Sequence, residues 1–135
     1  MRGIEWFRDG DTPLALVMRA EVHPEGARFF TPDDAALQVG LLGHRSGVVA
    51  APHTHHRIQR VIADTCEVLH VRAGRVSVDL YDLQRRLAHT VELAAGDTIL
   101  LMAGGHGLQV LEDSLVLEVR QGPYLGVNDK ERFDP

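Results

Sequence analysis

Short apolar stretches separated by Gly, Pro and Asp run along the whole chain, and they limit the fold more than any other feature of the sequence. No amphipathic helical period lasts more than about two turns, so we expect an all-β chain. The predicted strands cover residues 13–22, 36–42, 48–52, 67–72, 75–81, 89–93, 98–102, 107–111 and 115–121.

Two short segments predict tight turns between neighbouring antiparallel strands. Ala73 is followed by Gly74, which can supply a positive φ, and residues 112–114 have a turn composition. About nine short strands are too many for an open two-layer sheet in a chain of 135 residues, which favours a closed antiparallel barrel or jelly roll.

A single domain is expected over residues 1–135. Its barrel core is predicted at about residues 36–122, after an N-terminal strand segment at residues 1–30. A polar tail at residues 126–135 is either an arm or disordered.

Composition excludes several classes of partner. The chain has 14 basic and 19 acidic residues and a net charge of −5, which disfavours nucleic acid and anionic membranes. Cys66 is the single cysteine, so no intrachain disulfide can form, and we expect a cytoplasmic protein without a membrane span or signal peptide.

Two histidines form the first part of a predicted metal site. His53 and His55 lie two residues apart in a stretch that should be extended, so both rings should share one face of the strand. As an isolated pair they could equally be exposed loop residues, and the metal interpretation depends on the residues that follow.

Glu67 begins an apolar strand and should share a face with Leu69 and Val71. A carboxylate among apolar side chains is costly to bury unless it is neutralised or finds a cation. A metal shared with histidines would stabilise it, and a salt bridge to Arg60 is the alternative.

His106 follows an apolar strand and a Gly-rich bend, and it should share a face with Leu108 and Val110. The alternative is a core histidine that bonds a backbone carbonyl. Together with the residues above it gives three histidines and one carboxylate, which suit Fe, Mn, Ni, Co or Zn.

At these residues the chain resembles the cupin superfamily, whose first motif has the form G(x)5HxH(x)3-4E(x)6G. Gly47 stands six residues before His53, and Glu67 stands seven before Gly74. The resemblance covers about residues 38–122 and implies a jelly-roll barrel, or double-stranded β-helix, that holds one divalent metal through His53, His55, Glu67 and His106.

The chain departs from the family pattern in the spacing of its carboxylate. Counting four residues forward from His55 reaches Gln59, whereas counting seven back from Gly74 reaches Glu67. We favour Glu67, because a carboxylate offsets the charge of a metal better than an amide does. Gln59 and Arg60 then become candidates for contacts around the metal or with a substrate.

The strand at residues 115–121 has one apolar face, formed by Leu115, Leu117 and Val119. We expect this face inside the barrel, which would bring Gln121 to the barrel opening. There its amide would orient a substrate or make a simple terminal hydrogen bond.

The favoured function is a metal-dependent enzyme of dioxygenase or isomerase type that acts on a small polar molecule. A non-catalytic module that binds a small molecule or metal is the main alternative, and a metal-free isomerase of sugar nucleotides is another. A homodimer is also expected from the resemblance, because the apolar residues 14–18 could add a strand across an interface.

Overall fold

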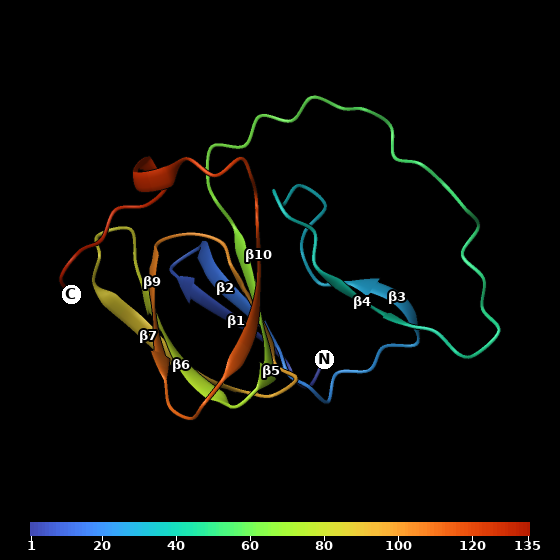
Figure 1. Cartoon of the computed structure of the whole chain (residues 1–135), viewed down its shortest axis with the longest axis horizontal. Coiled ribbons are helices and arrows are strands. Elements are labelled where there is room, and N and C mark those ends of the chain that lie inside the picture. The colour runs from blue at the N-terminus through green and yellow to red at the C-terminus, as the bar shows by residue number, and fades with distance from the viewer. The chain divides into compact units, whose positions relative to one another are not determined.

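The chain is built from antiparallel β-strands and contains no α-helix, which confirms the all-β prediction. The computed structural model describes residues 1–135. No helix in it is long and apolar enough to cross a membrane. In order, the elements are β1 (Ile4–Asp9), β2 (Thr12–Met18), β3 (Gly26–Phe29), β4 (Gly40–Gly43), β5 (Glu67–Ala73), β6 (Arg75–Tyr81), β7 (Leu87–Ala94), β8 (Thr98–Leu101), β9 (Gly105–Val110), β10 (Leu115–Arg120) and the 3-10 helix η1 (Gly126–Asn128) (Figure 1).

Two compact units make up the chain. The core unit joins Met1–Val22 to Thr65–Pro135, and the inserted unit is His23–Asp64. Strands β3 and β4 pair as a small sheet within the inserted unit, and the other strands belong to the core unit. The single domain predicted from the sequence stays a prediction.

The core unit contains two open sheets. One has five strands in the order β1-β2-β8-β5-β10, and the other has three in the order β7-β6-β9. From β5 onward, each strand lies in a different sheet from the strand before it, except that β6 and β7 pair within one sheet. Strands distant in sequence therefore become neighbours. Neither sheet closes on itself, and the closed jelly-roll barrel stays a prediction.

The hydrophobic core lies between these sheets because strand side chains alternate between two faces. Val76, Val78 and Leu80 of β6 are at most 1% exposed, and they pack with side chains from β2, β5, β7 and β8. The core also takes Leu14 and Val17 from β2, which precede the core range expected from the sequence.

Strand β2 has no free edge. It pairs with β1 on one side and with β8 on the other, with Leu16 opposite both Trp6 and Leu100. The expectation that residues 14–18 add a strand across a dimer interface is therefore wrong, because both edges of that strand are used within the chain. The homodimer itself stays a prediction.

Both predicted hairpin turns are corners between sheets. Gly74 has the expected positive φ of 81°, but β5 before it and β6 after it belong to different sheets. The turn at residues 112–114 likewise joins β9 to β10, in the other sheet. A bend at a flexible residue marks the end of a strand without fixing the strand's next partner.

Three strand predictions need further correction. Residues 48–52 form no strand, and regular structure is absent between β4 and β5. Strands β1 and β3 lie within the predicted N-terminal strand segment at residues 1–30, but they were not assigned as separate strands. The apolar face of β10 was placed inside, whereas Leu115, Leu117 and Val119 are 55%, 51% and 50% exposed. Pairing with β5 instead sets Arg120 opposite Glu67, and Val116 packs against the core.

Candidate functional site

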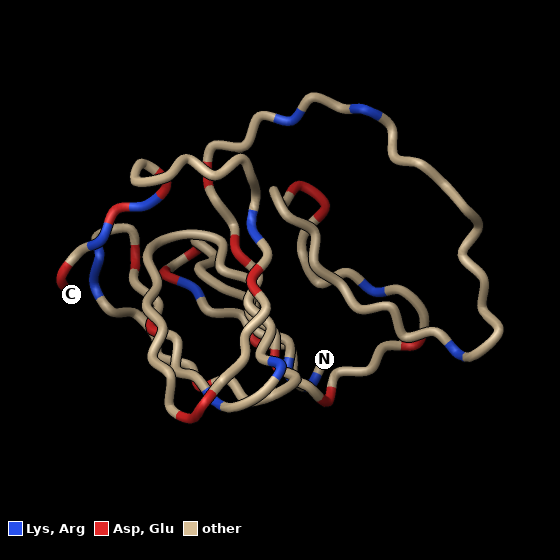
Figure 2. Tube along the Cα trace, viewed as in Figure 1, with Lys and Arg blue, Asp and Glu red and all other residues tan.

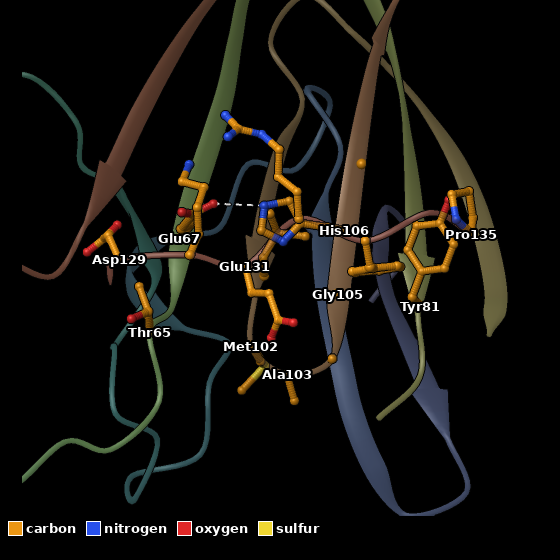
Figure 3. A pocket seen from close by; sticks show the side chains of 16 residues that line it. Thr65, Glu67, Tyr81, Met102, Ala103, Gly105, His106, Asp129, Glu131 and Pro135 are labelled. Atoms are coloured by element: carbon orange, nitrogen blue, oxygen red, sulfur yellow. Dashed lines mark ion pairs between the residues drawn. The ribbon is translucent and has the colours of Figure 1, made fainter. Parts of the chain in front are cut away.

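A cavity of about 580 Å³ opens on the core unit. Its walls are the start of β5, the bend that leads from β8 into β9, and the C-terminal residues 129–133 with Pro135 (Figure 3). The Gly-rich bend predicted from the sequence therefore lies in a pocket wall, where glycine backbone leaves room.

Two of the predicted metal ligands meet in this pocket. Glu67 is the first residue of β5, and His106 is the second residue of β9, in the other sheet. The imidazole Nε2 lies 3.0 Å from the carboxylate Oε2, and the two side chains face each other (Figure 3). The Glu67 side chain is 12% exposed and that of His106 is 37% exposed, so the carboxylate is the deeper partner.

Arg120 provides a second cation beside Glu67. Its Nη1 lies 3.6 Å from Glu67 Oε1 and 3.1 Å from Asp129 Oδ2, and its Nε lies 3.6 Å from Glu118 Oε1. One guanidinium thus serves three carboxylates, only one of them at close range. The sequence analysis had proposed a metal or Arg60 as the partner of Glu67, and it overlooked Arg120.

His53 and His55 belong to the inserted unit. Their ring centroids lie 5.3 Å apart with an interplanar angle of 67°, and His53 Nδ1 lies 2.9 Å from the carbonyl oxygen of Ala51. The two rings are adjacent, as predicted, although the backbone that carries them is irregular and not a strand. Both residues are exposed, and so are Gln59 and Arg60.

Gln121 makes the terminal hydrogen bond that was one of its two predicted roles. Its side-chain oxygen accepts a hydrogen bond from the Cys66 backbone N–H at 2.7 Å. This bond joins the residue after β10 to the residue before β5 and so aligns the strand ends that carry Arg120 and Glu67. Its side-chain Nε2 is buried without a hydrogen-bond partner.

The pocket also uses residues that the sequence analysis missed. Tyr81 ends β6, and its ring packs edge-to-face on Phe133 with centroids 5.2 Å apart. Asp129 and Glu131 line the same wall. Their only signal in the sequence is a charged tail containing one aromatic residue, a pattern equally typical of a solvated arm.

No group of three or more His, Cys, Asp or Glu side chains is arranged in the structure to hold a metal ion. The chain matches no protein-family model, no curated protein and no solved structure.

Proposed function

We propose that the chain is a small cupin-type protein that binds one divalent transition metal through His53, His55, Glu67 and His106. In this proposal it is an enzyme that acts on a small polar molecule bound in the pocket. The observation that carries the proposal is the pairing of Glu67 with His106 at 3.0 Å on facing strands.

The donor atoms of this pair suit a transition metal. Two ligands at right angles on a metal with bonds of about 2.1 Å lie about 3 Å apart, and Nε2 and Oε2 have that separation. An imidazole nitrogen with a carboxylate oxygen is a common combination for Fe, Mn, Co, Ni and Zn. The partly buried carboxylate would also offset the charge of the metal.

The inserted unit would supply the remaining donors. The rings of His53 and His55 are adjacent and would form a chelating pair. Both rings are exposed and available to bind a metal. Together with Glu67 and His106, this pair would complete a set of four ligands.

The strand order of the core unit supports a jelly roll. Four of the connections between consecutive strands, β5 to β6, β7 to β8, β8 to β9 and β9 to β10, lead from one sheet to the other, as in folds made of Greek keys. Both β9 and β10 are edge strands, so each sheet has a free edge beside the pocket-bearing strands. A closed barrel would require further strand pairing at those edges.

The chemistry of the pocket fits a small polar ligand. A metal bound there would polarise an oxygen atom of the ligand. Around it, the chain offers the phenol of Tyr81 and the charged side chains of Lys130 and Arg132 to orient the ligand, with apolar contact from Leu101. Space for a ligand above the pair distinguishes this arrangement from a closed structural metal site.

Titration with Fe(II), Mn(II), Co(II), Ni(II) and Zn(II), followed by competition with a chromophoric chelator, tests the proposal. We expect one ion per chain and a loss of affinity greater than about 100-fold in Glu67→Gln and in His106→Ala. His53→Ala should lose affinity similarly. Gln59→Ala is the matched control and should bind like the unmodified chain. Unchanged affinity in all three ligand variants would refute the metal site.

A metal-free proton-transfer site is the second candidate, and the contact with Arg120 favours it. Glu67 already lies within 3.6 Å of two protein cations when His106 is protonated, so its charge can be balanced without a metal. In that case Glu67 would orient the imidazole, and His106 would exchange a proton with the ligand. Full activity after complete metal removal would select this candidate.

A further inference from the structure

The C-terminal residues 129–135 form one wall of the pocket without being part of a sheet. Asp129 N–H donates to the carbonyl of Gly126, and residues 130–135 make no backbone–backbone hydrogen bond. This wall is therefore held by side chains, unlike β5 and β9, which are fixed by strand pairing. A segment held in this way can lift without breaking a sheet.

Its contacts with the rest of the core unit occur at every second residue. Acidic and basic residues alternate along this segment, as Figure 2 shows by colour. The contacts are Asp129 with Arg120 at 3.1 Å, Glu131 with Arg85 at 2.7 Å, and Phe133 with Tyr81 at 5.2 Å between ring centroids.

Arg85 contacts two of these positions and has a strained backbone. Its guanidinium donates a hydrogen bond to Glu131 and lies 5.2 Å from the ring centroid of Phe133. It occupies the turn between β6 and β7 with a φ of +64°, a conformation that glycine adopts more cheaply. Strain at a residue that also makes directed contacts points to a role for its side chain.

The Phe133 ring fills a space next to His106. A Cβ atom added at Gly105 would lie 2.8 Å from Cζ of Phe133, so the ring occupies the space that a side chain at position 105 would need. Residues 105 and 106 are consecutive in β9. The aromatic contact therefore lies beside the imidazole of the candidate site.

We propose that residues 129–135 are a lid on the pocket, closed by Arg85 through Glu131 and Phe133, and that the lid opens to admit the ligand. We call the contacts of Arg85 with Glu131 and Phe133 the latch. Its ion pair, between Arg85 and Glu131, is exposed, with side chains 51% and 75% accessible, so salt screens it. The aromatic contact between Phe133 and Tyr81 is less sensitive to salt and favours the closed position of the segment. This inference goes beyond the proposed function and holds for either candidate function.

Chemical modification of His106 by diethylpyrocarbonate, followed by mass spectrometry, tests the lid without any metal or ligand. We expect Arg85→Gly and Glu131→Gln to raise the modification rate of His106 about threefold, as the loss of an exposed ion pair would allow. Raising NaCl from about 0.02 M to about 0.5 M should increase the modification rate of His106 in the unmodified chain and have little effect on this rate in Arg85→Gly.

Internal controls separate lid opening from unfolding. The rate at His70, which bonds Thr98 Oγ1 at 2.9 Å, should not change. Arg85→Gly should keep or raise the melting temperature, because glycine relieves the positive φ. Glu112→Gln removes a different exposed carboxylate, paired with Arg75, and should leave His106 unaffected. The lid would be overturned if His106 were modified at the same rate in Arg85→Gly, Glu131→Gln and the unmodified chain. It would also be overturned if Glu112→Gln raised this rate as much as the two latch variants do.

Discussion

Two arginines of the core unit sit among carboxylates, and their surroundings differ. Arg19 donates to Glu5 at 2.6 Å, to Asp97 at 3.0 Å and to the carbonyl of Glu92 at 2.7 Å. Its hydrogen bonds with Glu5 and Asp97 raise the pKa of the Arg19 guanidinium, while burial lowers it to a lesser degree than the Glu5 contact raises it. Arg120, beside Glu67, has ion-pair distances of 3.1 to 3.6 Å.

The network around Arg19 and Asp97 stabilises the fold, whereas the network around Arg120 and Glu67 can bind a ligand or metal. Asp97 also accepts hydrogen bonds from the backbone N–H groups of Ala20 and Ala94, so its carboxylate is saturated and joins three segments. Glu67 Oε1 lies 3.6 Å from Arg120 and Glu67 lines a cavity, so this oxygen can accept a new partner. The predictions below test this contrast.

The largest effect is expected for Asp97→Asn. The amide NH2 would face Arg19 Nη1 and Ala94 N–H, which both donate to Asp97 Oδ2 in the chain. We expect a loss of about 2–4 kcal/mol in the free energy of unfolding, because buried donors lose their acceptor. Urea denaturation measures it, and a loss below about 1 kcal/mol would contradict a saturated network.

Arg120→Met should have a smaller effect on stability and a distinct effect on binding. We expect the free energy of unfolding to change by less than about 1 kcal/mol, because two of the three ion pairs of Arg120 have N···O distances of 3.6 Å and only that with Asp129 is closer, at 3.1 Å. Metal affinity should rise severalfold, since a metal at Glu67 no longer competes with the guanidinium. Chelator competition on this variant checks the second effect, and a fall in affinity would count against it.

Asp82, in the turn that carries Arg85, predicts a pH effect. The backbone N–H of Arg86 donates to this carboxylate and lowers its pKa below the ordinary value of 3.8; the Arg86 guanidinium and the Gln84 N–H add to the shift, and desolvation opposes it. The unfolded chain therefore binds this proton first as the pH falls. Stability from Asp82 is complete above the unfolded pKa and is lost as the pH drops through the folded pKa.

Thermal unfolding of Asp82→Asn between pH 2 and pH 6 measures this contribution, with both limits chosen to bracket a carboxylate titration at about 3.9. The variant should show a shallower loss of stability on the acid side than the unmodified chain. Identical slopes would mean that the turn carboxylate is not linked to folding. Glu112→Gln is a suitable reference, because its exposed pair with Arg75 should contribute less than about 0.5 kcal/mol.

The sequence predicts the strands of the core unit well where alternation is regular. Strands β5, β6 and β8 lie close to their expected positions, because Val76, Val78 and Leu80 repeat with a period of two. Strand β1 was not predicted as a separate strand, because Arg8 and Asp9 interrupt its apolar character at the edge of a sheet. Sheet membership could not be predicted, because Gly74 marks a bend and carries no information on which strands the next segment will meet.

The candidate site was predicted in part. Alternation places Glu67 on the inward face of β5 with Leu69 and Val71, as expected. It does not explain His106, because Leu108 and Val110, expected on the same face of β9, are 49% and 58% exposed. The metal set that adds His53 and His55 stays a prediction. The role of Arg120 could not be read from the sequence, since it depends on the register between β10 and β5, which only the folded pairing fixes.

The central position of β2 also sets the order in which the chain can fold. Strands β1 and β2 are neighbours in sequence and can pair early as a local hairpin. The pairing of β2 with β8, in which Met18 lies opposite Thr98, can form only after β8 has been synthesised. A nascent chain therefore carries the apolar side chains of β2 uncovered until β8 has been synthesised. Pairing between such distant segments slows folding and leaves the early hairpin open to aggregation or chaperone binding during translation.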